Sequence, residues 1–308
     1  MTDRSVAVLI PCFNEAQSIA GVVRAFKAQL PDAQVWVYDN NSTDATRAEA
    51  SAAGALVRSE RLQGKGNVVR RMFADIDADV FVLVDGDGTY EAATAPAMIE
   101  QLIADDLDMV VGLRVQPAEQ AYRRGHEFGN RLLTGMTARL FHNQFADMLS
   151  GYRVFSRRFV KSFPSLSSGF EIETELTVHA LELRLPIREV PTPYGARPPG
   201  SSSKLNTYSD GARILRVIVT LYKDERPLRF FLFFAVALLL LGLASGIPVV
   251  IEYFQIGLVP RLPRAVLATG LCILSALNVF AGLILDNVTR GRREIKRLAY
   301  LSTAKRAP

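Results

Sequence analysis

The sequence predicts an α/β protein in which a mostly parallel sheet is followed by two long apolar helices. Over the first 206 or so residues, short apolar runs alternate with helical stretches, as in βαβ units. Further on, Phe230–Ile251 and Ala265–Leu285 carry no charge, and each is close to the ~20 residues that span a bilayer's hydrocarbon core. The predicted parts are a sheet domain at 1–206, an amphipathic helix at 207–226, a transmembrane hairpin at 227–289 (spans at about 229–251 and 265–286) and a basic tail at 290–308.

Five segments are predicted to be strands because each is short, mostly apolar and bounded by polar or turn residues. In chain order they are Val6–Ile10, Val35–Tyr38, Ala55–Arg58, Val80–Val84 and Met109–Val111. The predicted helices between them are Glu15–Gln29, a helix that follows the capping residues of Asp39–Asp44 and ends at Ala53, Lys65–Ile76 and Pro96–Ala104. Because helices join successive strands, we expect the strands to run parallel.

Beyond the fifth strand the alternation is less regular. Helices are predicted at Tyr122–Phe141 and Phe170–Arg184, with a turn and a strand at Asp147–Phe155 between them. Gly195–Ser203 is rich in Pro, Gly and Ser and predicts a flexible loop. In Thr207–Tyr222, apolar residues recur at helical spacing beside arginines, which favours an interfacial helix on a membrane. An ordinary amphipathic surface helix is the alternative.

The positions of Lys and Arg predict how the hairpin is oriented. Basic residues flank its outer ends, at Lys223, Arg226, Arg229, Arg290, Arg292, Arg293, Lys296, Arg297, Lys305 and Arg306. The loop between the helices has only Arg261 and Arg264. The positive-inside rule therefore places both termini and the sheet domain in the cytoplasm, and no signal-peptide pattern precedes the first strand. We expect a multi-pass protein of the cytoplasmic membrane.

Composition narrows the partners. The net charge of +5 is concentrated beside the hairpin, which favours anionic headgroups or phosphorylated substrates over nucleic acid. Cys12 and Cys272 lie in different regions, so no disulfide framework is expected. The three histidines show no metal-ligand spacing.

Three polar clusters follow predicted strands, at Pro11–Glu15, Asp39–Asp44 and Asp85–Thr89. Since ligands of parallel sheets bind outside the carboxyl ends of the strands, these clusters are expected to meet in one crevice. Asp85 and Asp87 offer hard oxygen ligands that suit Mg²⁺ or Mn²⁺ bridging a diphosphate. A solvated turn is the alternative for an Asp-x-Asp sequence, but the preceding buried strand favours a functional site.

Five segments carry a resemblance to a known family: Ile10–Glu15, Tyr38–Asp44, Leu83–Tyr90, Ser150–Arg153 and Arg197–Lys204. Together they resemble the family 2 glycosyltransferases of the GT-A (Rossmann-like) fold. Within that family the chain is similar to the polyprenyl-phosphate glycosyltransferases, the dolichyl-phosphate mannose synthase and GtrB-like group. The motifs span the soluble part in the expected order, and members of that group also carry a C-terminal membrane pair.

The resemblance implies a set of donor-binding residues. The nucleoside would be held by Pro11, Phe13, Glu15 and Asp39, and Lys65 could also touch the nucleotide. Asp85 would lie near the ribose and the metal, and Asp87 would be the main metal ligand. Relatives often have Gln two residues after that second Asp, where this chain has Thr89, a weaker ligand.

The expected acceptor is a polyprenyl phosphate, which is largely ionised at neutral pH and needs no strong general base. The enzyme must supply cations, and the candidates are Arg114, one of Arg123 and Arg124, and Arg197 with Lys204 on the flexible loop. Ser150 fits the small polar position of the acceptor loop, which Asp147 would orient. Glu171 and Glu173 occupy positions where other GT-A enzymes place a base, or are surface residues.

The sequence therefore predicts inverting, metal-dependent transfer of one sugar from a nucleotide-sugar, with UDP favoured, to a polyprenyl phosphate. Two alternatives remain open. A processive polysaccharide synthase would usually carry a Gln-x-x-Arg-Trp helix, whereas the single tryptophan here, Trp36, lies in a predicted strand. A non-catalytic nucleotide-sugar-binding scaffold would bind donor without transferring it. The hairpin could also mediate self-association.

Overall fold

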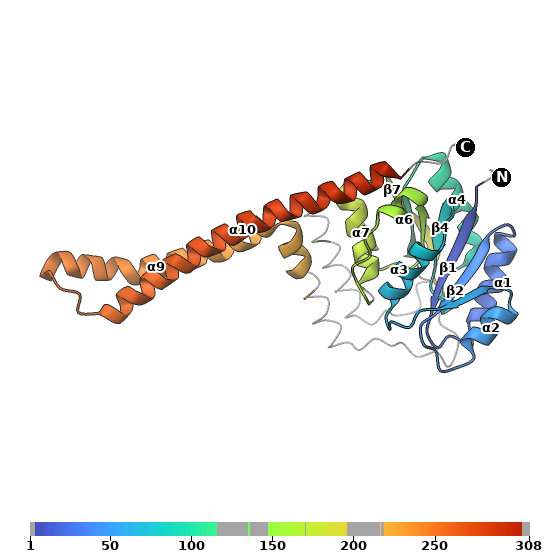
Figure 1. Cartoon of the computed structure of the whole chain (residues 1–308), viewed down its shortest axis with the longest axis horizontal. Coiled ribbons are helices and arrows are strands. Elements are labelled where there is room, and N and C mark those ends of the chain that lie inside the picture. The colour runs from blue at the N-terminus through green and yellow to red at the C-terminus, as the bar shows by residue number, and fades with distance from the viewer. Residues whose placement is uncertain are drawn as a thin grey trace. The chain divides into compact units, whose positions relative to one another are not determined.

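A computed structural model gives the structure of the chain and describes residues 4–115, 135, 147–169, 171–195, 216 and 219–303 (Figure 1). The chain divides into two compact units. The first unit combines Met1–Ile214 with Ile295–Pro308, and the second is Leu215–Glu294. Most of each helix predicted at 122–141 and at 207–222 lies outside the described residues.

The first unit is built on a seven-stranded sheet with the order β3-β2-β1-β4-β6-β5-β7. Its strands are β1 (Val6–Cys12), β2 (Gln34–Asp39), β3 (Leu56–Ser59), β4 (Val80–Leu83), β5 (Met109–Val115), β6 (Arg153–Ser156) and β7 (Ile187–Pro193). Strand β6 is antiparallel to β4 and β5, and the remaining neighbours pair in parallel. The predicted mostly parallel α/β sheet is therefore confirmed.

Helices cover both faces of the sheet (Figure 1). They are α1 (Ile19–Gln29), α2 (Thr46–Ala52), α3 (Lys65–Asp75), the short 3₁₀ helix η1 (Ala92–Thr94), α4 (Ala95–Ala104), α6 (Arg157–Ser162) and α7 (Ile172–Leu183). Helices α1, α2 and α4 lie on one face and α3, α6 and α7 on the other. Because the central strands are covered twice, both sides of each strand are apolar, which explains their nearly continuous apolar runs.

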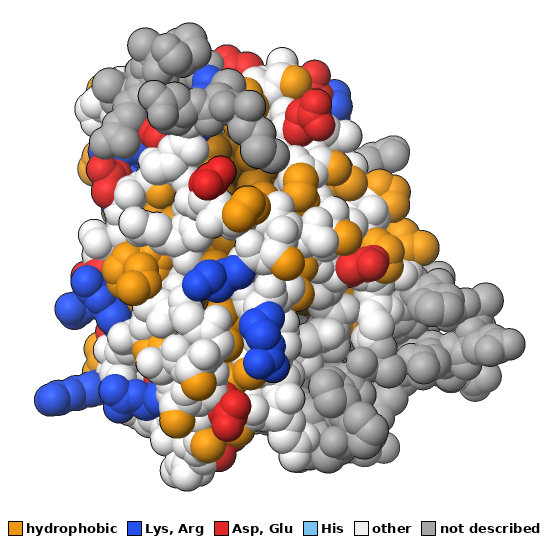
Figure 2. Space-filling model, turned by 90° about the vertical axis from the view of Figure 1, so that its right-hand side faces the viewer, with side chains coloured by type: hydrophobic (Ala, Val, Ile, Leu, Met, Phe, Trp, Pro, Cys, Tyr) orange, Lys and Arg blue, Asp and Glu red, His pale blue; other side chains and the backbone are white. Residues whose placement is uncertain are grey.

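Each face of the sheet has its own apolar contacts. Towards α1 and α4, the buried core includes Ile10, Val82 and Phe26. Towards α3 and α6, the ring of Phe73 meets that of Phe155 edge-on, with 5.9 Å between centroids. The outer surface on the α1 and α2 side intersperses basic and acidic side chains with uncharged ones (Figure 2).

Several element bounds differ from the sequence expectations. Strand β1 continues through Pro11, because its pairing with β4 ends at Leu9↔Leu83 and the missing Pro N–H breaks no ladder bond on that side. Helix α1 begins only at Ile19. Strand β7 and helix α6 were not predicted; β7 is an edge strand of mixed polarity, so its sequence shows no apolar run.

The sheet opens where β1 and β4 separate beyond Leu9. Strand order reverses at this position, since β2 and β3 follow on one side of β1 and β4 on the other. Ligands of open α/β sheets bind at such a switch point, outside the carboxyl ends of the strands. The loops after β1, β2 and β4 are therefore placed around one crevice.

The second unit contains α9 (Pro227–Ile256) and most of α10 (Leu262–Ser302), which are long and apolar enough to cross a membrane by length and composition. Only 11% and 17% of their most apolar 18-residue windows are buried, unlike the core helices of soluble proteins. Apart from Pro227, the buried positions of the two helices are mostly small and recur every seven residues: Ala235, Gly242 and Val249 on α9, and Ala268, Ser275, Gly282 and Thr289 on α10. Such a seam allows close helix approach, and Ser275 Oγ donates to the Ala235 carbonyl at 2.7 Å.

The last residues of α10 belong to the first unit and bind its surface. The hydroxyl of Tyr300 donates to Asp108 Oδ2 at 2.7 Å, and the Arg158 guanidinium lies 4.9 Å from the Tyr300 ring centroid. Lys296 pairs with Glu182 at 2.6 Å. Much of the predicted basic tail is thus helical, because helix-forming Arg, Glu, Lys and Leu continue the apolar run.

Candidate active site

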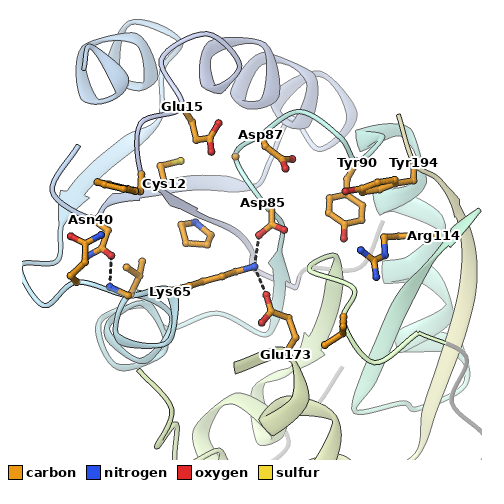
Figure 3. A pocket seen from close by; sticks show the side chains of 17 residues that line it. Cys12, Glu15, Asn40, Lys65, Asp85, Asp87, Tyr90, Arg114, Glu173 and Tyr194 are labelled. Atoms are coloured by element: carbon orange, nitrogen blue, oxygen red, sulfur yellow. Dashed lines mark hydrogen bonds and ion pairs between the residues drawn. The ribbon is translucent and has the colours of Figure 1, made fainter. Parts of the chain in front are cut away.

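A cleft of about 410 Å³ lies at the carboxyl ends of β1 and β4, where the predicted polar clusters meet (Figure 3). Among the residues that the structure describes, the charged lining consists of Glu15, Lys65, Asp85, Asp87, Arg114 and Glu173. Four carboxylates and two cations give this lining a net formal charge of −2. An anionic ligand would therefore enter more easily together with a divalent cation.

Asp85 and Asp87 occupy the loop that follows β4. The Asp85 side chain is 31% exposed and faces the cleft (Figure 3). A Cβ on Gly151 would lie 2.3 Å from Asp85 Oδ2, so glycine at that position leaves room for the carboxylate. Asp87 Oδ1 accepts from both the Thr89 backbone N–H (3.1 Å) and the Thr89 hydroxyl (2.6 Å), which fixes the orientation of Asp87.

Lys65 begins α3 and extends into the cleft between two carboxylates (Figure 3). Its ammonium contacts Asp85 Oδ1 and lies 2.5 Å from Glu173 Oε1. Burial alone would lower the pKa of Lys65, but the charges of Asp85 and Glu173 outweigh it and raise that pKa above the ordinary value. Lys65 is therefore a cation throughout the physiological pH range.

Arg114 reaches the opposite wall of the cleft from the end of β5. Asp147 holds its guanidinium through two bonds, from Nε to Oδ2 at 2.6 Å and from Nη2 to Oδ1 at 2.8 Å. The guanidinium carbon also lies 5.5 Å from the ring centroid of Tyr194. A bidentate pair of this kind fixes both the position and the direction of the cation.

The structure gathers seven of the predicted site residues along the cleft: Pro11, Phe13, Glu15, Lys65, Asp85, Asp87 and Arg114. Three others are buried beside it. Asp39 accepts the Ser42 N–H at 3.3 Å, Ser150 donates to the Gly112 carbonyl at 2.6 Å, and Thr89 donates to Asp87. The predicted Arg123, Arg124, Arg197 and Lys204 lie outside the described residues.

The cleft also contains residues that were not singled out from the sequence. Tyr90 lies near Arg114, accepts the Gly151 N–H at 2.9 Å, and has a pKa raised mainly by burial, so its hydroxyl stays neutral. Tyr194 follows the unpredicted strand β7 and had no sequence signal. Asn40 accepts the Gly64 N–H at 2.7 Å and thereby fixes the turn that leads into Lys65. Asn40 belongs to the polar cluster Asp39–Asp44, and this position was the sequence feature that could have identified it as a site residue.

The donor set suits a hard divalent cation. Within the described residues, no group of three or more His, Cys, Asp or Glu side chains could form a complete metal site. Asp85 and Asp87 supply carboxylate oxygens in one cleft, as a Mg²⁺ or Mn²⁺ site completed by substrate phosphates and water requires. The residues present therefore fit such a metal.

Comparisons with known proteins agree with this geometry. The family described as Glycosyl transferase family 2 matches residues 7–163. Glycosyltransferase AglJ of Haloferax volcanii is 34% identical over 303 residues, which is 97% of this chain and 99% of that protein. Protein RfbJ of Shigella flexneri is 55% identical over 123 residues, 40% of this chain and 95% of that protein. The crystal structure of Mycobacterium tuberculosis glucosyl-3-phosphoglycerate synthase with Mn²⁺, UDP-glucose and phosphoglyceric acid is 25% identical, with a TM-score of 0.58, and covers 72% of this chain and 79% of that one.

Proposed function

This chain belongs to glycosyl transferase family 2, and from that premise we propose that it transfers one sugar, with inversion, from a UDP-sugar to a polyprenyl phosphate at the cytoplasmic membrane. One observation carries the proposal. The same chain has a charged cleft suited to a nucleotide-sugar and two helices long and apolar enough to cross a membrane. A soluble donor and a lipid acceptor explain why both parts occur in one protein. AglJ is similar over nearly the whole of both chains, which supports treating the cleft and the two apolar helices as parts of one functional protein.

The donor half of the proposal is supported by the cleft and by its structural relative. We propose that Pro11, Phe13, Glu15 and Asp39 surround the nucleoside. Lys65 extends into the cleft from the start of α3, and its side chain is 8% exposed. Glucosyl-3-phosphoglycerate synthase, which has been solved with Mn²⁺ and UDP-glucose, supports UDP and Mn²⁺ as the first donor and metal to test. Asp85 and Asp87 would hold the metal, and Thr89 would act with them or by orienting Asp87. When bound, the metal offsets the charge of the leaving diphosphate.

The transfer itself requires a bond exchange at the anomeric carbon. A phosphate oxygen of the acceptor forms a bond to that carbon from the side opposite the diphosphate. The bond from the carbon to the diphosphate oxygen breaks, and its electron pair leaves with the nucleoside diphosphate. No proton has to move, because the acceptor phosphate is already ionised. What the chain supplies is orientation of the acceptor, for which Arg114 is fixed by Asp147.

The remaining proposed residues act around this step. Arg123 or Arg124 would join Arg114 at the acceptor phosphate, and Arg197 with Lys204 would close over the diphosphate. The backbone of the Ser150 loop is held by the Ser150 hydroxyl on Gly112. The two apolar helices would anchor the chain in the membrane, with both termini on the cytoplasmic side.

The test uses detergent-purified protein with Mn²⁺ or Mg²⁺, undecaprenyl phosphate and labelled UDP- and GDP-sugars. Label from one sugar should enter a single acid-labile lipid that is extracted into organic solvent. Asp87→Asn should abolish the transfer, whereas Asp105→Asn, which removes an exposed partner of Arg188, should not.

Other outcomes overturn parts of the proposal. Full metal-dependent transfer by Asp87→Asn would contradict the role of Asp87. Label in a water-soluble product would exclude the lipid acceptor, and long lipid-free polymer would indicate a processive synthase. Donor binding without transfer to any acceptor would indicate a scaffold.

A further inference from the structure

Lys65 is a largely enclosed cation of the cleft. Its side chain is 8% exposed, as is that of Glu173 on α7. The ammonium bridges Glu173 Oε1 and Asp85 Oδ1. Glu173 Oε2 is also buried, and among the described residues it has no hydrogen-bond partner. An unpaired buried carboxylate oxygen is costly and calls for an explanation.

The backbone around Lys65 is fixed, so only its side chain has room to move. Gly64 has a φ of +126°, and a Cβ on Gly64 or Gly66 would lie 2.1 Å from the carbonyl oxygen of Ser168 or Ser167. The Gly66 N–H donates to the Ser168 carbonyl at 3.1 Å. Rotation of the lysine side chain between its two carboxylates therefore rearranges the cluster without moving this backbone.

In the proposed function, Lys65 and the metal compete for the carboxylate of Asp85. In the structure it is paired with Lys65, whereas the donor and its metal require the same carboxylate. A lysine ammonium has three N–H donors, and the two oxygens of Glu173 share one carbon. A small rotation of Lys65 away from Asp85 would thus place its ammonium against both Glu173 oxygens. The unpaired Oε2 would then gain its partner at the moment when Asp85 is released.

We propose that Glu173 is a positioning residue that takes Lys65 over from Asp85 when a metal–nucleotide complex binds. The inference rests on the proposed function, because it names how that donor site changes on binding. It also assigns a role to Glu173 other than a general base. A carboxylate that holds a buried ammonium throughout the cycle is not available to remove a proton from an acceptor.

The first experiment measures binding of Mn²⁺·UDP by titration calorimetry, without any acceptor. In Glu173→Gln, Asp85 is the one carboxylate among the described residues that still contacts Lys65, so the incoming complex must break a stronger pair. We expect the dissociation constant to rise by about tenfold or more. Glu171→Gln is the matched control, since it removes the same charge two residues away at the N-cap of α7 and does not line the cleft. It should change the constant less than ~2-fold, as expected for a site outside the cluster.

A double-mutant cycle separates positioning from structural damage. In Lys65→Met there is no ammonium to transfer, so adding Glu173→Gln should leave Mn²⁺·UDP binding nearly unchanged. Lys65→Met alone leaves Glu173 as an unpaired buried charge and should lower the unfolding temperature, and the double variant should recover much of that loss. A crystal structure of the Mn²⁺·UDP complex should show the Lys65 ammonium on both Glu173 oxygens and off Asp85.

Three results would overturn the inference. If Glu173→Gln lowers the unfolding temperature while the folded protein binds Mn²⁺·UDP as tightly as wild type, the role of Glu173 is purely structural. If binding is unchanged but single-turnover transfer is lost, Glu173 acts as a base. If Lys65 stays on Asp85 in the complex, there is no exchange. A wild-type protein that binds neither Mn²⁺·UDP nor Mn²⁺·GDP would instead overturn the proposed function and this inference with it.

Discussion

Asp147→Asn tests how much the ion pair between Asp147 and Arg114 contributes to the stability of the fold and to the orientation of the Arg114 guanidinium. Asparagine has nearly the same shape as aspartate but carries no charge. Asp147 and Arg114 have side chains that are 6% and 15% exposed, and they are joined by two short bonds. The substitution therefore leaves a largely buried guanidinium facing a neutral amide.

The size of the effect follows from this burial. Removing one partner of a buried pair costs about 3–5 kcal/mol. Asparagine keeps one carbonyl acceptor for Arg114, and the guanidinium retains some contact with solvent, so we expect about 2–3 kcal/mol here. The control is Asp105→Asn, which breaks the Arg188 pair on the same unit. Those side chains are 41% and 49% exposed, and the expected cost is below about 1 kcal/mol.

Thermal unfolding of the two variants in the same detergent measures the difference. For a domain of about 150–250 residues, 2–3 kcal/mol corresponds to a fall in Tm of roughly 4–12 °C. Asp147→Asn should also reduce sugar transfer while leaving Mn²⁺·UDP binding unchanged, because Arg114 is assigned to the acceptor. Equal shifts in Tm for Asp147→Asn and Asp105→Asn would refute the reasoning about burial. Weakened UDP binding would place Arg114 on the donor instead.

Four further predictions follow from single contacts. Chelation of divalent cations should weaken UDP binding at least tenfold, as measured by calorimetry, because the lining of the cleft is already anionic. Gly151→Ala should weaken Mn²⁺·UDP binding in the same assay, because its Cβ would displace the Asp85 carboxylate. Tyr300→Phe should cost about 1–3 kcal/mol in denaturant unfolding, since buried Asp108 loses a donor. Burial lowers the pKa of His179 to about 3, below its unfolded value near 6.5, so this group's contribution to stability is complete above pH ~6.5 and is lost toward pH 3 at about 1.4 kcal/mol per unit. Unfolding of His179→Phe across that range should lack this slope.

The part of the fold that the sequence predicts is the part with strong periodicity. Strands β1, β4 and β5 are largely buried and read as apolar runs, and the order of the strands along the chain fixes which loops follow them. Strand β7 lies at an edge, and three of its seven residues are polar and two are prolines, so no local pattern distinguishes it from a loop. The sequence also does not predict that α10 continues into the first unit, because hydropathy identifies the apolar run but not the residue at which the helix ends.

The candidate site also has residues whose positions the sequence predicts and residues whose positions it does not. The places of Asp85 and Asp87 in the cleft were predictable because they closely follow a buried strand, and that of Arg114 because it lies near the end of another. Tyr194 was not, since its position depends on β7. Glu173 could be read equally well as a base or as a surface residue. Only the fold shows that the first turns of α3 and α7 meet and that Lys65 lies between Asp85 and Glu173.

The pairing of both cations in the cleft has a consequence for how the donor is held. Lys65 is matched by Asp85 and Glu173, and Arg114 by Asp147, so neither brings net positive charge to an incoming diphosphate. Within the described part of the cleft, the remaining source of attraction is a charge that arrives with the nucleotide, which makes a divalent cation part of the ligand rather than a fixed part of the protein. In the proposed mechanism the paired cations would orient the ligands: Lys65 would control when Asp85 is available, and Arg114 would fix the direction from which an anionic acceptor approaches. Binding and orientation are thereby assigned to different charges, so substitutions at Asp87 and at Asp147 should affect separate steps.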